Sequence, residues 1–260
     1  MGVNVVVCVK HVPDTEAQVR LRPDGRGIEE SGLNFVLNYY DEHGVEEALR
    51  IKERFGGTVT LVTAGPPRAV EGLRAGLAMG GDAAVHIQDQ ALAGLDHIGI
   101  ARVLAAAIKS LPCDLVLCGK LSTDDNAGVV GPALAEFLGL AQVTAVTKLE
   151  LAAGGTATAH REIEGAVETL EVRLPAVITV ERGINEPRYP SLPGIMRAKR
   201  TPITVRSLAD LGMSMPPKAH VELLRLAPPP KRQAGRRLEG EAAAVVEELI
   251  RALREEAKVL

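Results

Sequence analysis

The sequence has no tryptophan and few aromatic residues, and this limits the ligands it is suited to bind. Aromatic residues make up 2% of the 260 positions. Proteins that bind single-stranded nucleic acid without sequence preference stack bases on exposed rings, so the composition argues against that function. The net charge of -3 gives no overall basic surface for DNA or RNA either. We therefore expect no nucleic-acid partner.

Cysteine and long apolar runs are also scarce. Cys8, Cys113 and Cys118 form an odd, scattered set, which predicts neither a disulfide framework nor a zinc site. Cys8 and Cys118 stand in apolar strand patterns, which is typical of core thiols. No apolar stretch reaches the length of a bilayer span, and the first residues run into a strand pattern without the features of a signal peptide. We expect a cytoplasmic protein with no direct membrane insertion.

Apolar residues make up 46% of the chain, which is ample for a packed core. Four apolar runs predict buried strands: residues 3–9, 58–64, 83–87 and 115–118. Helical patterns follow these runs at residues 40–55, 68–79, 96–110 and after Asn126. Within the first of these helices, Glu46 and Arg50 have the spacing of an i,i+4 ion pair. This alternation predicts an α/β fold with a doubly wound, mostly parallel sheet. A ligand should then lie at the carboxyl ends of the strands, here Val9-Lys10, Ala64-Gly65, Ile87-Gln88 and Gly119-Lys120.

The stretch from Leu115 to Leu138 is the first candidate for such a ligand site. It reads as strand, glycine-containing loop and helix, an arrangement that presents backbone N–H groups to an anion. The loop matches neither a Walker A sequence nor a strict G-x-G-x-x-G. The alternative is a helix capped by Asp124 or Asp125 with nothing bound.

The remaining segments predict additions to the α/β unit. Residues 18–28 read as a small hairpin, and residues 142–174 as an antiparallel extension that is followed by a core strand at 175–180. Residues 186–202 contain four prolines and predict a long loop, either tucked onto the core or docking a partner through its apolar centre. A stiff linker begins at Pro228, and residues 239–258 predict a charged helix that folds back or wraps a partner. We therefore divide the chain into residues 1–227 and residues 228–260.

The sequence contains no recognisable catalytic constellation. Its six histidines lack metal-ligand spacing, and there is no G-x-S-x-G elbow. Asp124 and Asp125 are candidates for acid/base residues or metal ligands, against the alternative of loop and cap residues. We expect no catalytic residue and no metal site, which favours a binding protein over a hydrolase.

Several segments together resemble the beta subunit of electron transfer flavoprotein. Residues 159–179, AHREIEGAVETLEVRLPAVIT, are similar to the family's signature, and residues 185–199, NEPRYPSLPGIMRAK, resemble its recognition loop. Residues 7–14 and the stretch from Gly119 to Gly131 resemble the family's first strand and phosphate loop. The likeness covers essentially the whole chain.

The resemblance implies an electron-carrier subunit of the adenine-nucleotide-binding type. It implies a heterodimer with an alpha subunit that holds most of the FAD contacts, a structural AMP in this chain, and transfer of electrons from acyl-CoA and related dehydrogenases to a quinone oxidoreductase. Docking would use the loop 185–202 through Leu192, Pro193, Ile195 and Met196. By the same matching, the AMP site would comprise Cys8, Asn38, Tyr39, Tyr40, Asp41, Ala64, Leu121, Ser122, Thr123, Asp124, Asp125, Asn126, Ala127, Gly128, Val129, Val130, Gly131 and Pro132, with the phosphate on the backbone of 126–131.

Two positions depart from the family pattern. Some members carry an aromatic residue near the flavin where this chain has Thr15, and many carry glutamine where Val129 stands. Two other interpretations stay open: a bifurcating relative whose nucleotide site holds a second FAD, and a free-standing adenine-nucleotide sensor or hydrolase. A flavin count separates the first from the carrier, and ATP turnover by the lone chain tests the second.

Overall fold

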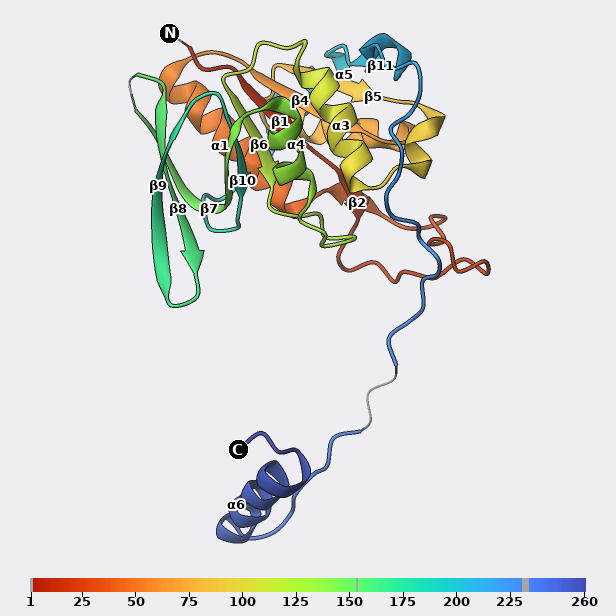
Figure 1. Cartoon of the computed structure of the whole chain (residues 1–260), viewed down its shortest axis with the longest axis vertical. Coiled ribbons are helices and arrows are strands. Elements are labelled where there is room, and N and C mark those ends of the chain that lie inside the picture. Colours follow the sequence, from red (N-terminus) through yellow and green to blue (C-terminus); the bar gives the residue numbers. More distant parts are fainter. Residues whose placement is uncertain (1, 153, 231–233) are drawn as a thin grey trace. The chain divides into compact units, whose positions relative to one another are not determined.

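A nine-stranded sheet organises the chain, in the order β11-β5-β4-β1-β6-β10-β7-β8-β9. The computed structural model describes residues 2–152, 154–230 and 234–260 (Figure 1). The strands are β1 Val5–Cys8, β2 His11–Pro13, β3 Phe35–Leu37, β4 Val59–Ala64, β5 Ala83–Ile87, β6 Leu115–Gly119, β7 Ala141–Ala152, β8 Thr156–Ile163, β9 Ala166–Arg173, β10 Ala176–Val180 and β11 Thr204–Arg206. The α-helices are α1 Tyr39–Phe55, α2 Val70–Met79, α3 His97–Ile108, α4 Val130–Leu138, α5 Leu192–Arg200 and α6 Ala242–Arg251. Short 3₁₀ turns lie at Pro67–Ala69, Gln90–Gly94 and Ala209–Leu211, and a π-helical turn at Ala252–Glu256 follows α6.

The sheet is parallel from β11 to β7, and β8 and β9 extend it with antiparallel pairing. Its central strand, β1, pairs with β4 on one side and β6 on the other. Alternate residues of these strands face two separate cores: Val5 and Val7 pack with α1 and α2, while Val6 and Cys8 pack with α3 and α4. The predicted doubly wound α/β sheet with an antiparallel extension is confirmed.

The chain then reverses direction across the sheet beside β1. It builds β4 and β5 on one side of that strand before it returns to build β6 and β10 on the other. Such a reversal opens a crevice at the carboxyl ends of the strands, which is where a parallel sheet binds ligands. The fold thus positions a site between the ends of β1, β4, β5 and β6.

Three local predictions were wrong. Residues 18–28 contain one isolated bridge, Leu21 with Ile28, instead of a two-stranded hairpin. Glu46 pairs with Arg188, and Arg50 approaches Glu47 instead. The cause is burial: Glu46 lies on the buried face of α1, whereas Arg50 is exposed.

The third wrong prediction is the loop at 186–202, because residues 192–200 form the helix α5. Ser191 caps this helix by accepting a hydrogen bond from the Gly194 N–H, and Pro193 stands in its first turn, where its missing N–H costs nothing. The last turn carries basic residues, which suit the negative end of a helix dipole.

The chain divides after Leu224 into two compact units. The second unit, Arg225–Leu260, contains α6, whose exposed apolar residues include Val246, Leu249 and Ile250. Lys231 to Gln233, within the predicted linker, lie outside the described residues. None of the helices in the described part of the chain combines the length and apolar character needed to cross a bilayer.

Candidate functional site

A cavity of about 990 Å³ lies at the carboxyl ends of β1, β4, β5 and β6. Each strand end predicted to meet a ligand contributes to its wall, through Lys10, Ala64, Gln88 and Gly119 among others. The volume lies at the upper end of the ~300–1,000 Å³ typical of small-molecule sites. The structure therefore places a ligand-sized cavity where the strand-end rule locates one.

The floor of the cavity is fixed by Asp41, a buried residue in the first turn of α1. Its Oδ2 accepts a hydrogen bond from the Lys10 N–H at 2.7 Å, and its Oδ1 accepts one from the Gly119 N–H at 3.0 Å. One carboxylate thus joins the ends of β1 and β6. Burial raises the pKa of Asp41 to about 7, although these N–H groups and Asn38 oppose the rise. Gly119 is required here because a Cβ would lie 2.4 Å from Asp41 Oδ1.

Two buried thiols complete this floor. Cys8 and Cys118 are register partners on β1 and β6, and both line the cavity. Both are free and buried, as predicted for core thiols. The hydrogen bond with Cys118 and burial raise the pKa of Cys8 well above its ordinary value, so it is a poor nucleophile at neutral pH.

The loop between β6 and α4 approaches the cavity with unpaired backbone donors. In the described part of the chain, the N–H groups from Gly128 to Gly131 have no hydrogen-bond acceptor, and all four residues line the cavity. The helix begins at Val130 behind an N-cap, Val129, whose side chain cannot accept a hydrogen bond. Gly128 has φ +64°, a left-handed conformation that favours glycine. We call this segment the backbone cradle.

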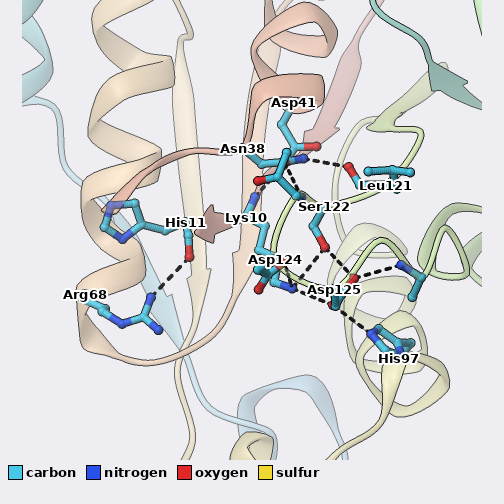
Figure 2. Close-up of polar contacts among 12 residues, drawn as sticks. Lys10, His11, Asn38, Asp41, Arg68, His97, Leu121, Ser122, Asp124 and Asp125 are labelled. Carbon is cyan, nitrogen blue, oxygen red and sulfur yellow. Dashed lines mark hydrogen bonds and ion pairs between the residues drawn. The ribbon is translucent and has the colours of Figure 1, made fainter. Parts of the chain in front are cut away.

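The alternative in which Asp124 or Asp125 caps α4 does not hold, because Val129 stands at the N-cap and both aspartates bond elsewhere. Lys10 Nζ lies 2.8 Å from Asp124 Oδ1, 2.9 Å from Asp125 Oδ2 and 3.1 Å from Ser122 Oγ (Figure 2). His97 Nε2 lies 2.9 Å from the same Asp125 oxygen. We call Lys10, His97, Ser122, Asp124 and Asp125 the rim cluster.

Asp125 is the centre of the rim cluster. Its Oδ1 accepts hydrogen bonds from the Ser122 hydroxyl at 2.9 Å and from the Ala127 N–H at 3.0 Å. Burial alone would raise its pKa, but these bonds and the contacts with His97 and Lys10 hold the pKa well below its usual range. Burial likewise opposes the charge of Lys10, yet Asp124 and Asp125 raise its pKa. Lys10 and Asp125 therefore stay ionised at neutral pH, and the contacts of Asp125 shape the loop that carries the cradle.

Asn38, the buried residue before α1, holds the start of the same loop. Its Nδ2 donates to the Leu121 carbonyl at 2.9 Å, and its Oδ1 accepts from the Thr123 N–H at 3.1 Å (Figure 2). An asparagine can satisfy both backbone groups at once because it carries a donor and an acceptor. The loop is thus fastened at both its start and its middle.

The predicted nucleotide residues divide among several places. Twelve line the cavity: Cys8, Asn38, Asp41, Ala64, Leu121, Ser122, Asp125, Ala127, Gly128, Val129, Val130 and Gly131. Tyr39 and Tyr40 line a separate hollow of about 1030 Å³, together with Tyr189. Thr123, Asp124, Asn126 and Pro132 line neither one.

The sequence interpretation missed one wall of the cavity. Leu92, Leu95, Ile100 and Leu104 form an apolar side, and Asp89, Asp96 and His97 stand at its edge. A usable signal was the pair Asp89 and Asp96, which cap the two helical segments that follow β5. The described residues contain no group of three or more His, Cys, Asp or Glu side chains placed to hold a metal ion.

The residues predicted to dock partners lie together on α5. Leu192, Pro193, Ile195 and Met196 are exposed, with 74% of Leu192 accessible. The opposite side of the helix is fixed on α2: Ala198 is buried, and Arg74 Nη1 donates to the Thr201 carbonyl at 2.6 Å. Gly194 permits this close packing, since a Cβ there would lie 2.5 Å from the Ala78 carbonyl oxygen. The apolar side chains are therefore presented on a rigid support.

Comparison with known proteins decides the family. A family profile described as "Electron transfer flavoprotein domain" matches residues 26–211. The chain belongs to the electron transfer flavoprotein family. It is 42% identical to "Electron transfer flavoprotein subunit beta" of Bacillus subtilis (strain 168), over 99% of this chain and 100% of the relative. The protein of the same description from Syntrophomonas wolfei is 37% identical over 100% and 99%, and a mitochondrial one from Arabidopsis thaliana is 38% identical over 98% and 99%.

These matches confirm the predicted likeness to the family's beta subunits and give the chain a role in electron transfer. Relatives of this kind align along nearly its whole length, so both the α/β unit and the C-terminal unit are covered. The cavity, the backbone cradle and α5 are thus features of a chain that resembles electron transfer flavoprotein beta subunits along nearly its whole length.

Proposed function

We propose that this chain pairs with an alpha subunit that carries FAD, and that it holds a structural AMP in the cavity at the carboxyl ends of the strands. In this proposal the heterodimer is a cytoplasmic carrier without catalytic residues of its own. It accepts electrons from acyl-CoA and related dehydrogenases and passes them to a quinone oxidoreductase. The flavin supplies the redox chemistry, while the protein supplies position and electrostatics.

The backbone cradle carries the nucleotide part of the proposal. Four consecutive residues of the described chain line the cavity with N–H groups that have no acceptor, and a phosphate satisfies such donors at a helix N-terminus. The apolar wall of Leu92, Leu95 and Ile100 suits the flat face of an adenine base. The residues present therefore fit an adenine mononucleotide.

The nucleotide test begins with the heterodimer as purified. We expect heat denaturation and filtration to release one AMP per heterodimer, and an empty supernatant would refute the AMP assignment. Val129→Glu places a carboxylate beside the cradle, and we expect it to weaken AMP binding about tenfold through charge repulsion. Val129→Gln has the same shape without the charge and should bind as the wild type does. Equal losses in the two variants would contradict a phosphate at this position.

The size of the cavity favours a second candidate. At about 990 Å³ it has more room than a mononucleotide needs, so a second FAD, as in a bifurcating relative, is the alternative occupant. Absorbance of the purified complex separates the two: one flavin per heterodimer supports AMP, and two support the second FAD.

The docking part of the proposal rests on α5. An exposed leucine on a supported helix provides a small anchor for a transient partner. We expect Leu192→Ala to lower the rate of electron transfer from an acyl-CoA dehydrogenase by about tenfold or more, as for an interface hot spot. The heterodimer and its flavin spectrum should not change. Val19→Ala is the control, because Val19 is an exposed apolar residue that lies outside the cavity and α5. Loss of the heterodimer in Leu192→Ala would show a structural role instead.

A further inference from the structure

The segment from Ser214 to Leu224, which we call the strap, crosses the N-terminal end of α3 beside the cavity. It is largely exposed, and Met215, Val221 and Leu224 each keep about three quarters of their surface accessible. Figure 1 shows the strap in blue alongside α3. The strap continues directly into the unit that begins at Arg225.

Asp96 holds the strap. Its Oδ2 accepts hydrogen bonds from the backbone N–H groups of His220, at 2.5 Å, and Val221, at 3.1 Å. In the described structure these are the only hydrogen bonds that join the strap to the rest of the chain. The other oxygen, Oδ1, caps α3 by accepting from the Gly99 N–H at 2.8 Å. The Asp96 carboxylate therefore binds both the first turn of α3 and the strap, one through each oxygen.

The next residue extends this contact to the cradle. His97 begins α3 and lies 2.9 Å from Asp125 Oδ2. Asp125 in turn accepts from the Ala127 N–H, one residue before the cradle. Asp96 and His97 both line the cavity. The strap is therefore hydrogen-bonded to Asp96, and the next residue along the backbone, His97, contacts Asp125 in the loop that carries the cradle.

We propose that Asp96 couples the strap to the cradle. Docking of the strap on Asp96 then sets how firmly the loop 122–131 holds its ligand. The path of contacts stands independently, whereas the consequence for ligand retention rests on the proposed nucleotide site. Coupling of this kind is reciprocal: a nucleotide that orders the cradle also favours the docked strap. Asp96 is a positioning residue here, acting through His97 and Asp125.

An isosteric substitution separates the two functions of Asp96. In Asp96→Asn the remaining oxygen still caps α3, since asparagine is as good a cap as aspartate, while the new NH₂ group cannot accept from His220 and Val221. Asp89→Asn is the matched control. Asp89 also lines the cavity and caps a helical segment through Ala91, but its second oxygen accepts from Leu208 instead of the strap. His220→Pro removes the shorter donor from the strap side and leaves the cavity wall intact.

Hydrogen–deuterium exchange of the full chain in its heterodimer gives a readout that needs no nucleotide. The amides of Asn126 and Ala127 are hydrogen-bonded inside the loop and report on it. We expect them to exchange about tenfold faster in Asp96→Asn and in His220→Pro, as for loss of one hydrogen bond to a charged acceptor, and at the wild-type rate in Asp89→Asn. Faster exchange confined to the strap would overturn the coupling, and so would equal acceleration in Asp89→Asn.

AMP retention gives the second readout. Protein loaded with radiolabelled AMP is chased with unlabelled AMP, and we expect label to leave Asp96→Asn and His220→Pro about tenfold faster than it leaves the wild type. Wild-type release rates in Asp96→Asn would refute the effect on the ligand. If the wild type binds no AMP at all, the proposed nucleotide function fails, and the exchange measurement still decides whether the strap and the cradle are coupled.

Discussion

Gly131, at the start of α4, provides the sharpest test of how the cradle is held. A Cβ at this position would lie 2.3 Å from Thr179 Cγ2 on β10, where ordinary carbon contacts are ~3.5–4.0 Å. Thr179 is buried, and its Oγ1 accepts from the Ala145 N–H at 2.8 Å. Its side chain cannot rotate away without leaving that N–H unpaired. Gly131→Ala must therefore move the start of the helix or break the Thr179 bond.

The size of the effect follows from these alternatives. Overpacking in a core costs ~1–3 kcal/mol, and an unpaired buried N–H costs a similar ~1–3 kcal/mol. Because the added Cβ would lie only 2.3 Å from Thr179 Cγ2, we take the upper end of either alternative, about 3 kcal/mol, as the gross penalty. Alanine is favoured over glycine in a helix by ~1 kcal/mol, which offsets part of it. We expect a net loss of about 2 kcal/mol, or a fall in Tm of roughly 4–8 °C for a unit of this size. Because the cradle moves with α4, AMP content should fall as well.

The assay compares chemical denaturation with and without added AMP. Gly94→Ala is the matched control, since no heavy atom lies within 4 Å of its added Cβ. We expect that variant to stay within about 1 kcal/mol of the wild type. The double variant Gly131→Ala with Thr179→Ser removes the opposing methyl group and keeps the hydroxyl. It should recover at least ~1 kcal/mol relative to the sum of the single changes. A stable Gly131→Ala protein that keeps its nucleotide would refute the argument, and failure of the rescue would place the strain elsewhere.

Three further predictions concern charged groups. Arg188→Ala leaves the buried Glu46 carboxylate unpaired and should lower the free energy of unfolding by ~3 kcal/mol in a denaturation assay. Arg188→Lys keeps the positive charge but loses the bidentate contact, so it should cost less. Equal losses in the two variants would show that the charge alone does not matter. Folding raises the pKa of Asp41 from 3.8 to about 7, so the folded chain binds this proton more tightly than the unfolded chain does. The contribution of Asp41 to stability is therefore complete below about pH 4 and is lost as the pH rises to about 7, by up to ~4 kcal/mol. Denaturation at several pH values should show a flatter profile in Asp41→Asn, and an unchanged profile would contradict the assignment. Lys10→Met removes the lysine that pairs with Asp125. We expect calorimetry to show AMP binding weakened several-fold at low salt and less at high salt. A loss that does not depend on salt would indicate a change in the shape of the cavity instead.

The strands were predictable from the sequence because strands covered on both faces consist of continuous apolar runs. Residues 5–9 and 115–118 have no polar interruption, and the structure places both strands between two cores. The position of the cavity followed from the order of strands and helices alone, since a parallel sheet binds ligands at its carboxyl ends. These features depend on local pattern and topology, which a single sequence contains.

The helix α5 could have been predicted from signals that were present. Four prolines between residues 187 and 202 indicated an irregular segment, yet Ser191 followed by Pro193 is a helix start, and a basic last turn is a helix end. Proline interrupts a helix only beyond its first turn. The number of prolines was therefore less informative than their positions.

The side-chain partners could not be predicted because they are far apart in the sequence. Lys10 pairs with Asp124 and Asp125, which are more than a hundred residues away in the sequence. Glu46 pairs with Arg188 and not with Arg50, which is one helical turn away. A local rule such as the i,i+4 pair gives only a few tenths of a kcal/mol, ~0.2–0.5. A buried carboxylate instead pairs with the donor that the tertiary fold places beside it, and a bidentate arginine is the strongest such partner.

The charges around the cradle bear on what kind of anion the cavity would keep. Lys10 is the lysine of the rim cluster, and the carboxylates of Asp124 and Asp125 already engage it, so two carboxylates share one ammonium group. An incoming phosphate would therefore be bound by uncharged N–H groups, with carboxylates nearby that repel any further phosphate. Binding through such donors depends less on salt than binding through lysine or arginine does. These features favour a nucleotide with a single phosphate that stays in place, as a structural AMP in an electron carrier would, over a triphosphate that is bound and released in turnover.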